Sequence, residues 1–291
     1  MRKRILCFGD SNTYGYIPAG GGKRYSSMIR WPRVLSVLLG EDYEVIEEGL
    51  GGRTINVDPP DDAWKNGMRS LYAILSSHRP LDLVIVMLGT NDLKNYFRLT
   101  EKEIAGSAGQ MVLAIQGFLK EKQGFQPDVL LMSPARLHPS APMGCFGEQF
   151  DEESVRVSRK LAEAYKNAAA EAGALFLDID PFTHVSADDG VHLDAESHIE
   201  LAYKLSDLVR DLYRDDTSFN VDARTDEEDF FRLIHAADRQ ERVNIDPLSA
   251  FLKEAGIRKD LQTGIINTER LREEIKTLRH EELIDYLKQM I

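Results

Sequence analysis

The sequence is poor in the features that mark secreted, membrane and nucleic-acid-binding proteins. It has only two cysteines in 291 residues, Cys7 and Cys145, which are too few for a disulfide framework. No apolar run approaches the length that spans a membrane, and the run behind the basic N-terminus is far shorter than a signal-peptide core. Lys and Arg number 36 against 48 Asp and Glu, and this excess of negative charge disfavours nucleic acid and anionic membrane surfaces as partners. We therefore expect a cytoplasmic protein that binds neither.

Five short runs of apolar and β-branched residues recur along the first 180 residues. Runs this apolar are typical of parallel strands buried on both faces, and stretches with helical spacing alternate with them. The alternation predicts an α/β fold with right-handed crossovers and helices on both faces of one sheet. The predicted strands are 4–9, 43–49, 81–89, 127–134 and 174–180. The predicted helices are 31–39, 64–77, 101–120, 151–172 and 195–213.

The pattern changes at residue 215, which divides the chain into a predicted α/β domain over 1–214 and a helical extension over 215–291. The extension holds 12 Lys and Arg against 18 Asp and Glu, half of the net charge of −12. Its amphipathic segments carry apolar side chains that a three-helix unit of this size rarely covers alone. We expect the extension to dock on its own core or to form a homo-oligomer with another subunit.

Polar residues follow four of the predicted strands, at the edge where parallel sheets gather their functional groups. Functional groups at strand ends meet in space even when they are far apart in the sequence. The residues that follow these four strands are Gly9-Asp10-Ser11, Gly51-Gly52, Asn91-Asp92, and Asp189 with His192.

Ser11, His192 and Asp189 are the residue types that acyl transfer needs. A serine hydroxyl is a weak nucleophile unless a base takes its proton as the new bond forms, and His192 is the candidate base. A carboxylate that holds the other ring nitrogen makes such a base more effective, and Asp189 lies three residues earlier on the same turn. The structural alternatives are a turn or N-cap role for Ser11 and a helix-capping loop role for His192.

Three N–H donors are candidates to meet the negative charge that develops on an attacked carbonyl oxygen. Gly52 offers a backbone N–H without an obstructing side chain, Asn91 a side-chain amide and Ser11 its own backbone N–H. The neighbouring carboxylates have expected structural roles, with Asp10 bonding backbone donors of the nucleophile turn and Asp92 capping a helix.

These residues lie in four blocks that resemble, in the right order, those of SGNH hydrolases, also called GDSL esterases. The resemblance covers about residues 3 to 213 and is closest to the bacterial arylesterase and acyltransferase branch. It implies a flavodoxin-like three-layer fold, a triad of Ser11, His192 and Asp189 without metal or cofactor, and an oxyanion hole in which Gly52 rather than Gly51 donates. It also implies hydrolysis of short-chain and aryl esters, with transfer of the acyl group to alcohols in some members. The blocks are "FGDSN", "GLGGRT", "GTND" and "DGVH".

Departures from the family pattern point to a more polar substrate pocket. Asn12 replaces the typical leucine after the nucleophile, and the aromatic pair that follows is Tyr14 and Tyr16 rather than two tryptophans. Arg53 and Lys94 are expected to line the mouth, where they either steer anionic or carbonyl groups or form a solvated rim.

Several alternatives compete with the esterase hypothesis. Deacetylation of a sugar or other polyol uses the same chemistry. A non-catalytic interaction module would use the acidic extension, and a nucleotide or flavin binder would use the sheet, although the chain lacks the Gly-x-Gly-x-x-Gly and Walker loops. A metal cluster is a weaker alternative, with candidate ligands at Asp178, Asp180, Asp188, Asp189, His184 and His192.

Overall fold

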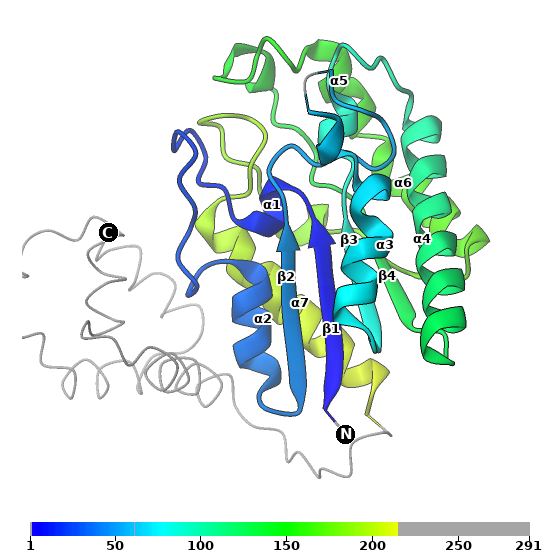
Figure 1. Ribbon diagram of the computed structural model, residues 1–291. Helices are drawn as coiled ribbons and strands as arrows, with labels where there is room; N and C mark the ends of the chain where they lie inside the picture. Colours follow the sequence, from blue (N-terminus) through cyan, green and yellow to red (C-terminus); the bar gives the residue numbers. More distant parts are fainter. Residues whose placement is uncertain (1, 61, 215–291) are drawn as a thin grey trace, which may run out of the picture. The chain divides into compact units, whose positions relative to one another are not determined.

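The centre of the structure, a computed structural model that describes residues 2–60 and 62–214, is a five-stranded parallel sheet (Figure 1). The strand order is β2-β1-β3-β4-β5, the flavodoxin-like order in which the chain reverses direction across the sheet between β1 and β3. This confirms the predicted α/β fold. The strands are β1 (Lys3–Gly9), β2 (Tyr43–Gly49), β3 (Leu83–Met87), β4 (Asp128–Met132) and β5 (Leu175–Leu177).

Helices cover both faces of the sheet, with α2 and α7 on one side and α3, α4 and α6 on the other (Figure 1). Ile5, Leu6, Cys7 and Phe8 of β1 are all fully buried, because each face of this central strand packs against a helical layer. The helices are α1 (Ser11–Tyr14), α2 (Trp31–Leu39), α3 (Gly67–His78), α4 (Glu101–Gln123), α5 (Glu152–Ser158), α6 (Leu161–Glu171) and α7 (Ala195–Leu212), with short 3-10 turns η1 (Ala63–Lys65), η2 (Asn91–Leu93), η3 (Ala141–Met143) and η4 (Asp180–Phe182).

The helix predicted over 151–172 is wrong as a single element, because the chain breaks it into α5 and α6. The break follows Ser158, whose hydroxyl donates to the carbonyl oxygen of Val155 at 2.8 Å. The same hydroxyl accepts the amide of Leu137 at 3.1 Å from another loop. A buried serine that bonds in this way competes with the regular helical ladder.

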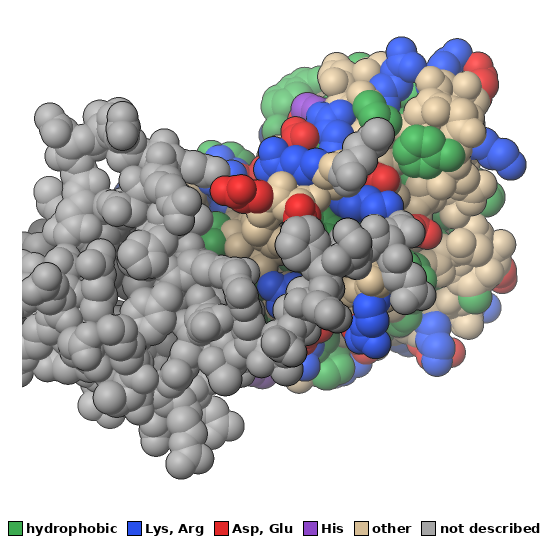
Figure 2. Space-filling view, turned by 90° about the horizontal axis from the view of Figure 1, so that it is seen from below, with side chains coloured by type: hydrophobic (Ala, Val, Ile, Leu, Met, Phe, Trp, Pro, Cys, Tyr) green, Lys and Arg blue, Asp and Glu red, His purple; other side chains and the backbone are tan. Residues whose placement is uncertain are grey.

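The face at the amino ends of the strands carries basic and acidic side chains that are interspersed (Figure 2). Arg4 pairs with Glu44 at 2.9 Å, and Lys3 pairs with Asp82 at 3.5 Å. Such partly exposed pairs make a solvated surface that contributes little to stability. The polar residues singled out by the sequence lie at the opposite edge of the sheet.

The predicted helical extension over 215–291, and the docking expected of it, lie outside the described residues. No helix within 2–60 and 62–214 combines the length and the apolar character needed to cross a membrane.

Candidate active site

The nucleophile turn begins where β1 ends at Gly9. The Asp10 carboxylate accepts the amide of Asn12 at 2.9 Å and caps α1, so that Ser11 becomes the first residue of this four-residue helix. This confirms the structural role predicted for Asp10. The turn packs directly on the last residue of β2, Gly49, where a Cβ would lie 2.2 Å from the backbone nitrogen of Tyr14. A side chain at position 49 would push the nucleophile turn away from the sheet.

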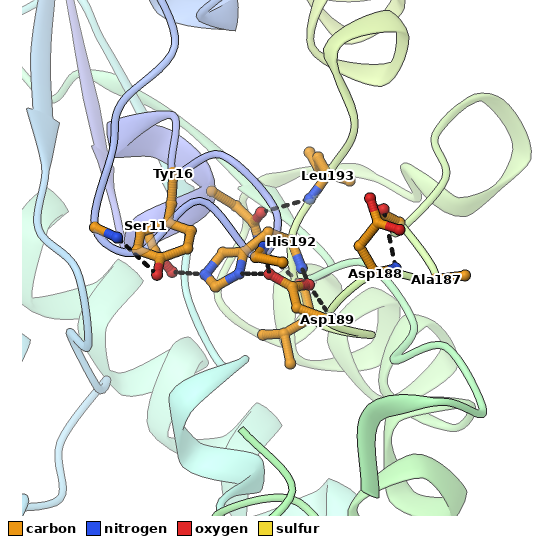
Figure 3. Close-up of polar contacts among 12 residues, drawn as sticks. Ser11, Tyr16, Ala187, Asp188, Asp189, His192 and Leu193 are labelled. Atoms are coloured by element: carbon orange, nitrogen blue, oxygen red, sulfur yellow. Dashed lines mark hydrogen bonds and ion pairs between the residues drawn. The ribbon is translucent and has the colours of Figure 1, made fainter. Parts of the chain in front are cut away.

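Ser11, His192 and Asp189 form a continuous chain of hydrogen bonds (Figure 3). Ser11 Oγ lies 2.9 Å from His192 Nε2, although the two residues are 181 positions apart. His192 Nδ1 lies 2.7 Å from Asp189 Oδ2. Ser11 and His192 keep 6% and 4% of their surface exposed, whereas Asp189 has none. All three residues of this hydrogen-bond chain are therefore buried.

The Asp189 carboxylate is held as an acceptor on both oxygens. Its Oδ1 accepts the amides of Val191 and His192 at 2.9 and 3.0 Å, and its Oδ2 also accepts the amide of Ala19 at 3.1 Å. Burial alone would raise the pKa of Asp189, but the hydrogen bond and charge of His192 and these amides hold that pKa below its ordinary value. An ionised, immobile carboxylate is what orients an imidazole for proton transfer.

Two aromatic rings cover the His192 imidazole. Tyr16 stacks on it with centroids 4.3 Å apart, and Phe146 meets it edge to face at 5.4 Å. The Tyr16 hydroxyl accepts the amide of Gly22 at 3.0 Å, which fixes the ring over the imidazole. Tyr16 is a predicted pocket residue, whereas Phe146 lies in the loop between η3 and α5, and the sequence carries no motif that points to it.

Arg53 links the three turns that carry Ser11, Gly52 and Asn91. Its guanidinium donates to the carbonyl oxygen of Gly9 at 2.8 Å and to that of Glu48, and it lies over the Phe8 ring. Its own carbonyl oxygen accepts the Asn91 side-chain amide at 3.1 Å. Gly52 has a φ of +84°, a conformation that favours glycine. The turns with the candidate N–H donors are thus fastened to the nucleophile turn.

Two of the predicted pocket residues do not line the mouth. Arg53 is only 3% exposed, and burial lowers its pKa to about 10. Asn12 is also 3% exposed, with both polar atoms of its side chain bonded to backbone. Tyr14 and Lys94 are half-buried. The pKa of Lys94 is lowered mainly by burial and, to a smaller extent, by the like charge of Lys65. Lys94 therefore remains the candidate at the mouth, and the two tyrosines remain candidates for the substrate pocket.

Two further buried carboxylates, those of Asp10 and Asp92, lie in and near the nucleophile turn. The sequence predicts that Asp92 caps a helix, but this prediction is wrong, because both of its oxygens accept the amide of Ile55 at 3.1 Å and its own turn has no side-chain cap. Burial, and then the charge of Asp10, raise the pKa of Asp92 to about 7. Burial also raises the pKa of Asp10 to about 6.

The acidic residues considered as metal ligands have other partners. Asp178 accepts the hydroxyl of Ser133 at 3.2 Å, and Asp180 accepts the amide of Arg136 at 3.0 Å. Within the described ranges, no group of three or more His, Cys, Asp or Glu side chains is arranged to hold a metal ion.

A serine, an imidazole and a buried carboxylate bonded in this order, at the carboxyl edge of a parallel sheet, define a serine hydrolase. The sequence profile of the GDSL-like lipase/acylhydrolase family matches residues 7–198, more than half of the chain. The chain therefore belongs to this family. No curated protein sequence matches it at a significant level.

Solved structures of esterases are similar to this chain in both sequence and fold. An inhibitor-bound aryl esterase of M. smegmatis is 39% identical with a TM-score of 0.68, over 72% of this chain and 99% of its own. Est24, a carbohydrate acetylesterase from Sinorhizobium meliloti, is 38% identical with a TM-score of 0.68, over 72% of this chain and 100% of its own. Together with the family match, these similarities make the protein a serine ester hydrolase.

Proposed function

We propose that this protein hydrolyses short-chain or aryl carboxylic esters through an acyl-enzyme on Ser11. The observation that carries the proposal is the hydrogen-bond chain from Ser11 Oγ through His192 to Asp189, with distances of 2.9 and 2.7 Å. Similarity to the M. smegmatis aryl esterase supports this substrate class.

In the first half of the reaction, Ser11 Oγ attacks the carbonyl carbon of the ester while His192 Nε2 accepts the hydroxyl proton. The carbonyl oxygen becomes an oxyanion, which accepts hydrogen bonds from the N–H groups of Ser11 and Gly52 and from the Asn91 amide. His192 then donates its proton to the leaving alkoxide or phenoxide oxygen, and the acyl group stays on Ser11. Asp189 orients the imidazole and stabilises its charge throughout.

In the second half, His192 takes a proton from a water molecule that attacks the acyl carbonyl, and returns that proton to Ser11 Oγ as the acid leaves. An alcohol that replaces water in this step accepts the acyl group instead. Acyl transfer to alcohols is therefore a branch of the same proposal.

A second candidate is deacetylation of a sugar or other polyol. The observation that favours it is the similarity to the S. meliloti carbohydrate acetylesterase, at 38% identity. Half-buried Tyr16, whose ring stacks on His192, offers an aromatic surface suited to a polyol leaving group.

We also propose a cytoplasmic location, supported by the low cysteine content.

The experiment measures nitrophenol release from p-nitrophenyl acetate by the full chain and by Ser11→Ala. We expect a burst of about one equivalent with the native protein, followed by turnover, and background release with the variant. Equal turnover by Ser11→Ala would remove Ser11 from the mechanism. Acetate release from an acetylated sugar, and formation of the new ester when an alcohol is added as acceptor, are measured beside it and rank the three reactions by kcat/KM.

A further inference from the structure

The side chain of Asn12 bonds to the backbone on both sides of His192. Asn12 Oδ1 accepts the amide of Leu193 at 2.9 Å, and its Nδ2 donates to the carbonyl oxygen of Val191 at 3.4 Å. Asn12 also directly follows Ser11 in the chain. One primary amide therefore connects the residue next to the nucleophile with both peptide groups that flank the base.

The segment Val191–Leu193 presents two hydrogen-bonding edges. On one edge, the amide of His192 donates to Asp189 Oδ1 at 3.0 Å, and its carbonyl oxygen accepts the amide of Ser186 at 2.9 Å. The flanking groups of Val191 and Leu193 point to the other edge, where the Asn12 amide meets them as a neighbouring strand would. The backbone of the base is therefore held from both sides.

We propose that Asn12 is a positioning residue that fixes the distance between Ser11 Oγ and His192 Nε2. The inference rests on the proposed function of Ser11 and His192. The turn that carries Ser11 and the loop that carries His192 lie far apart in the sequence, so their relative placement in space depends on contacts between them. Among the described residues, α1 is joined to Val191–Leu193 by the 2.9 Å hydrogen bond between Ser11 and His192 and by the two hydrogen bonds of Asn12.

Steric and chemical observations favour positioning over substrate binding. The Asn12 side chain is 3% exposed, and both its donor and its acceptor groups are occupied by the loop. A misplacement of the reacting groups by about 1 Å can lower the rate about 10²-fold, so a loosened loop has a large effect on the chemical step. The pocket that binds the ester would be little changed.

The test uses Asn12→Leu, which keeps the branched shape and removes both hydrogen bonds. With p-nitrophenyl acetate we expect kcat to fall about 10- to 100-fold, with KM within about threefold of the native value. The matched control is Thr13→Val in the same turn, because the buried Thr13 hydroxyl has no hydrogen-bond partner among the described residues. The control should keep kcat within about twofold.

A double-mutant cycle separates positioning from general damage to the turn. In a His192→Ala background, Asn12→Leu should leave the residual rate unchanged, because the group that Asn12 positions is absent. An equal proportional loss in both backgrounds would contradict the inference, and so would native kcat in a folded Asn12→Leu protein. If Asn12→Leu does not fold, Asn12→Ala removes both hydrogen bonds without adding an apolar branch, and native kcat in that variant is equally contradictory.

The failure of this inference is distinguishable from the failure of the proposed function. A native chain that does not turn over the ester, or that does so without Ser11, contradicts the proposed function. A native chain that depends on Ser11 and His192 but tolerates Asn12→Leu contradicts the positioning role alone.

Discussion

The loop that carries Asp189 and the region of the nucleophile turn, with Asp10 and Asp92, both bury carboxylates at the same edge of the sheet, but the pKa shifts of these carboxylates are opposite. Asp189 has no exposed surface, yet its pKa is held below the ordinary value of 3.8. Asp10 and Asp92 are each 1% exposed, and their pKa values rise to about 6 and about 7. Burial is the largest cause of both raised pKa values, and it acts against the lowered pKa of Asp189.

The partners of each carboxylate oppose or add to this effect of burial. Asp189 faces the imidazole of His192 and accepts three backbone amides, all of which favour the charged form. Asp92 accepts the amide of Ile55 and faces the like charge of Asp10. The pKa is therefore lowered at the carboxylate that is bonded directly to the imidazole and to several amides.

The largest expected effect comes from removing the charge of Asp189. Asp189→Asn keeps the size of the side chain but presents an amide that no longer favours the required tautomer of His192. We expect kcat for p-nitrophenyl acetate to fall about 10³- to 10⁴-fold, with KM changed far less. Steady-state kinetics on the folded variant checks this. A loss below about tenfold would show that the orientation of His192 does not depend on this carboxylate.

Asn91 and Asp92 are adjacent in the chain, but Asn91 is a candidate donor to the oxyanion, whereas Asp92 is one of the two carboxylates with a raised pKa. Asn91→Ala removes a candidate oxyanion donor, and we expect kcat to fall about 10²- to 10³-fold. Asp92→Asn should lower kcat less than tenfold under the same conditions, about the scale of an indirect effect. Measuring both variants with one ester at one pH makes each the control of the other. A reversed order would place Asp92 rather than Asn91 at the reacting carbonyl.

The smallest expected effect is on thermal stability. Replacing Asp92 should stabilise the native protein, whereas replacing Asp189 should destabilise it. Between pH values of about 4 and 7, folded Asp92 binds a proton that the unfolded chain has released, so this residue destabilises the native protein increasingly as pH rises. Asp92→Asn removes that cost, and its Tm should gain on the native Tm as pH rises through this range.

The control for this stability prediction is Asp189→Asn. Because the pKa of Asp189 is lower in the folded protein than its ordinary value of 3.8, this residue stabilises the native protein at pH values above 3.8. The stabilisation is lost as the pH falls through the pKa of the folded state. The Tm of Asp189→Asn should therefore lie below the native Tm at neutral pH, and the gap should narrow in acid. Thermal unfolding at a series of pH values measures both variants. Parallel Tm curves for Asp92→Asn and the native protein would contradict the raised pKa of Asp92.

The strands and the positions of the four polar blocks were predictable because both depend on local patterns. A short run rich in apolar and β-branched residues marks each strand. The parallel arrangement then brings the carboxyl ends of all strands to one edge of the sheet. Ser11, Asn91 and His192 are recognisable in this way without any knowledge of their contacts. Gly52 follows from the same reasoning, and its φ of +84° agrees with a tight turn at this position.

Side-chain direction was not predictable, since it depends on partners that are distant in the sequence. Asn12 meets backbone groups 179 and 181 residues away, so nothing near position 12 separates a pocket residue from an internal one. Arg53 turns inward to the carbonyl oxygens of Gly9 and Glu48, although arginine is usually exposed. Phe146 reaches His192 from a loop without any periodic pattern.

The most direct test of the account is covalent labelling of the full chain with a fluorophosphonate, followed by mass spectrometry of the peptides. Such a reagent reacts with a serine only where a base activates the hydroxyl. The account predicts one adduct per chain, on the peptide that contains Ser11, with labelling slowed by His192→Ala and abolished by Ser11→Ala. An adduct on another residue, or undiminished labelling of Ser11→Ala, would contradict it.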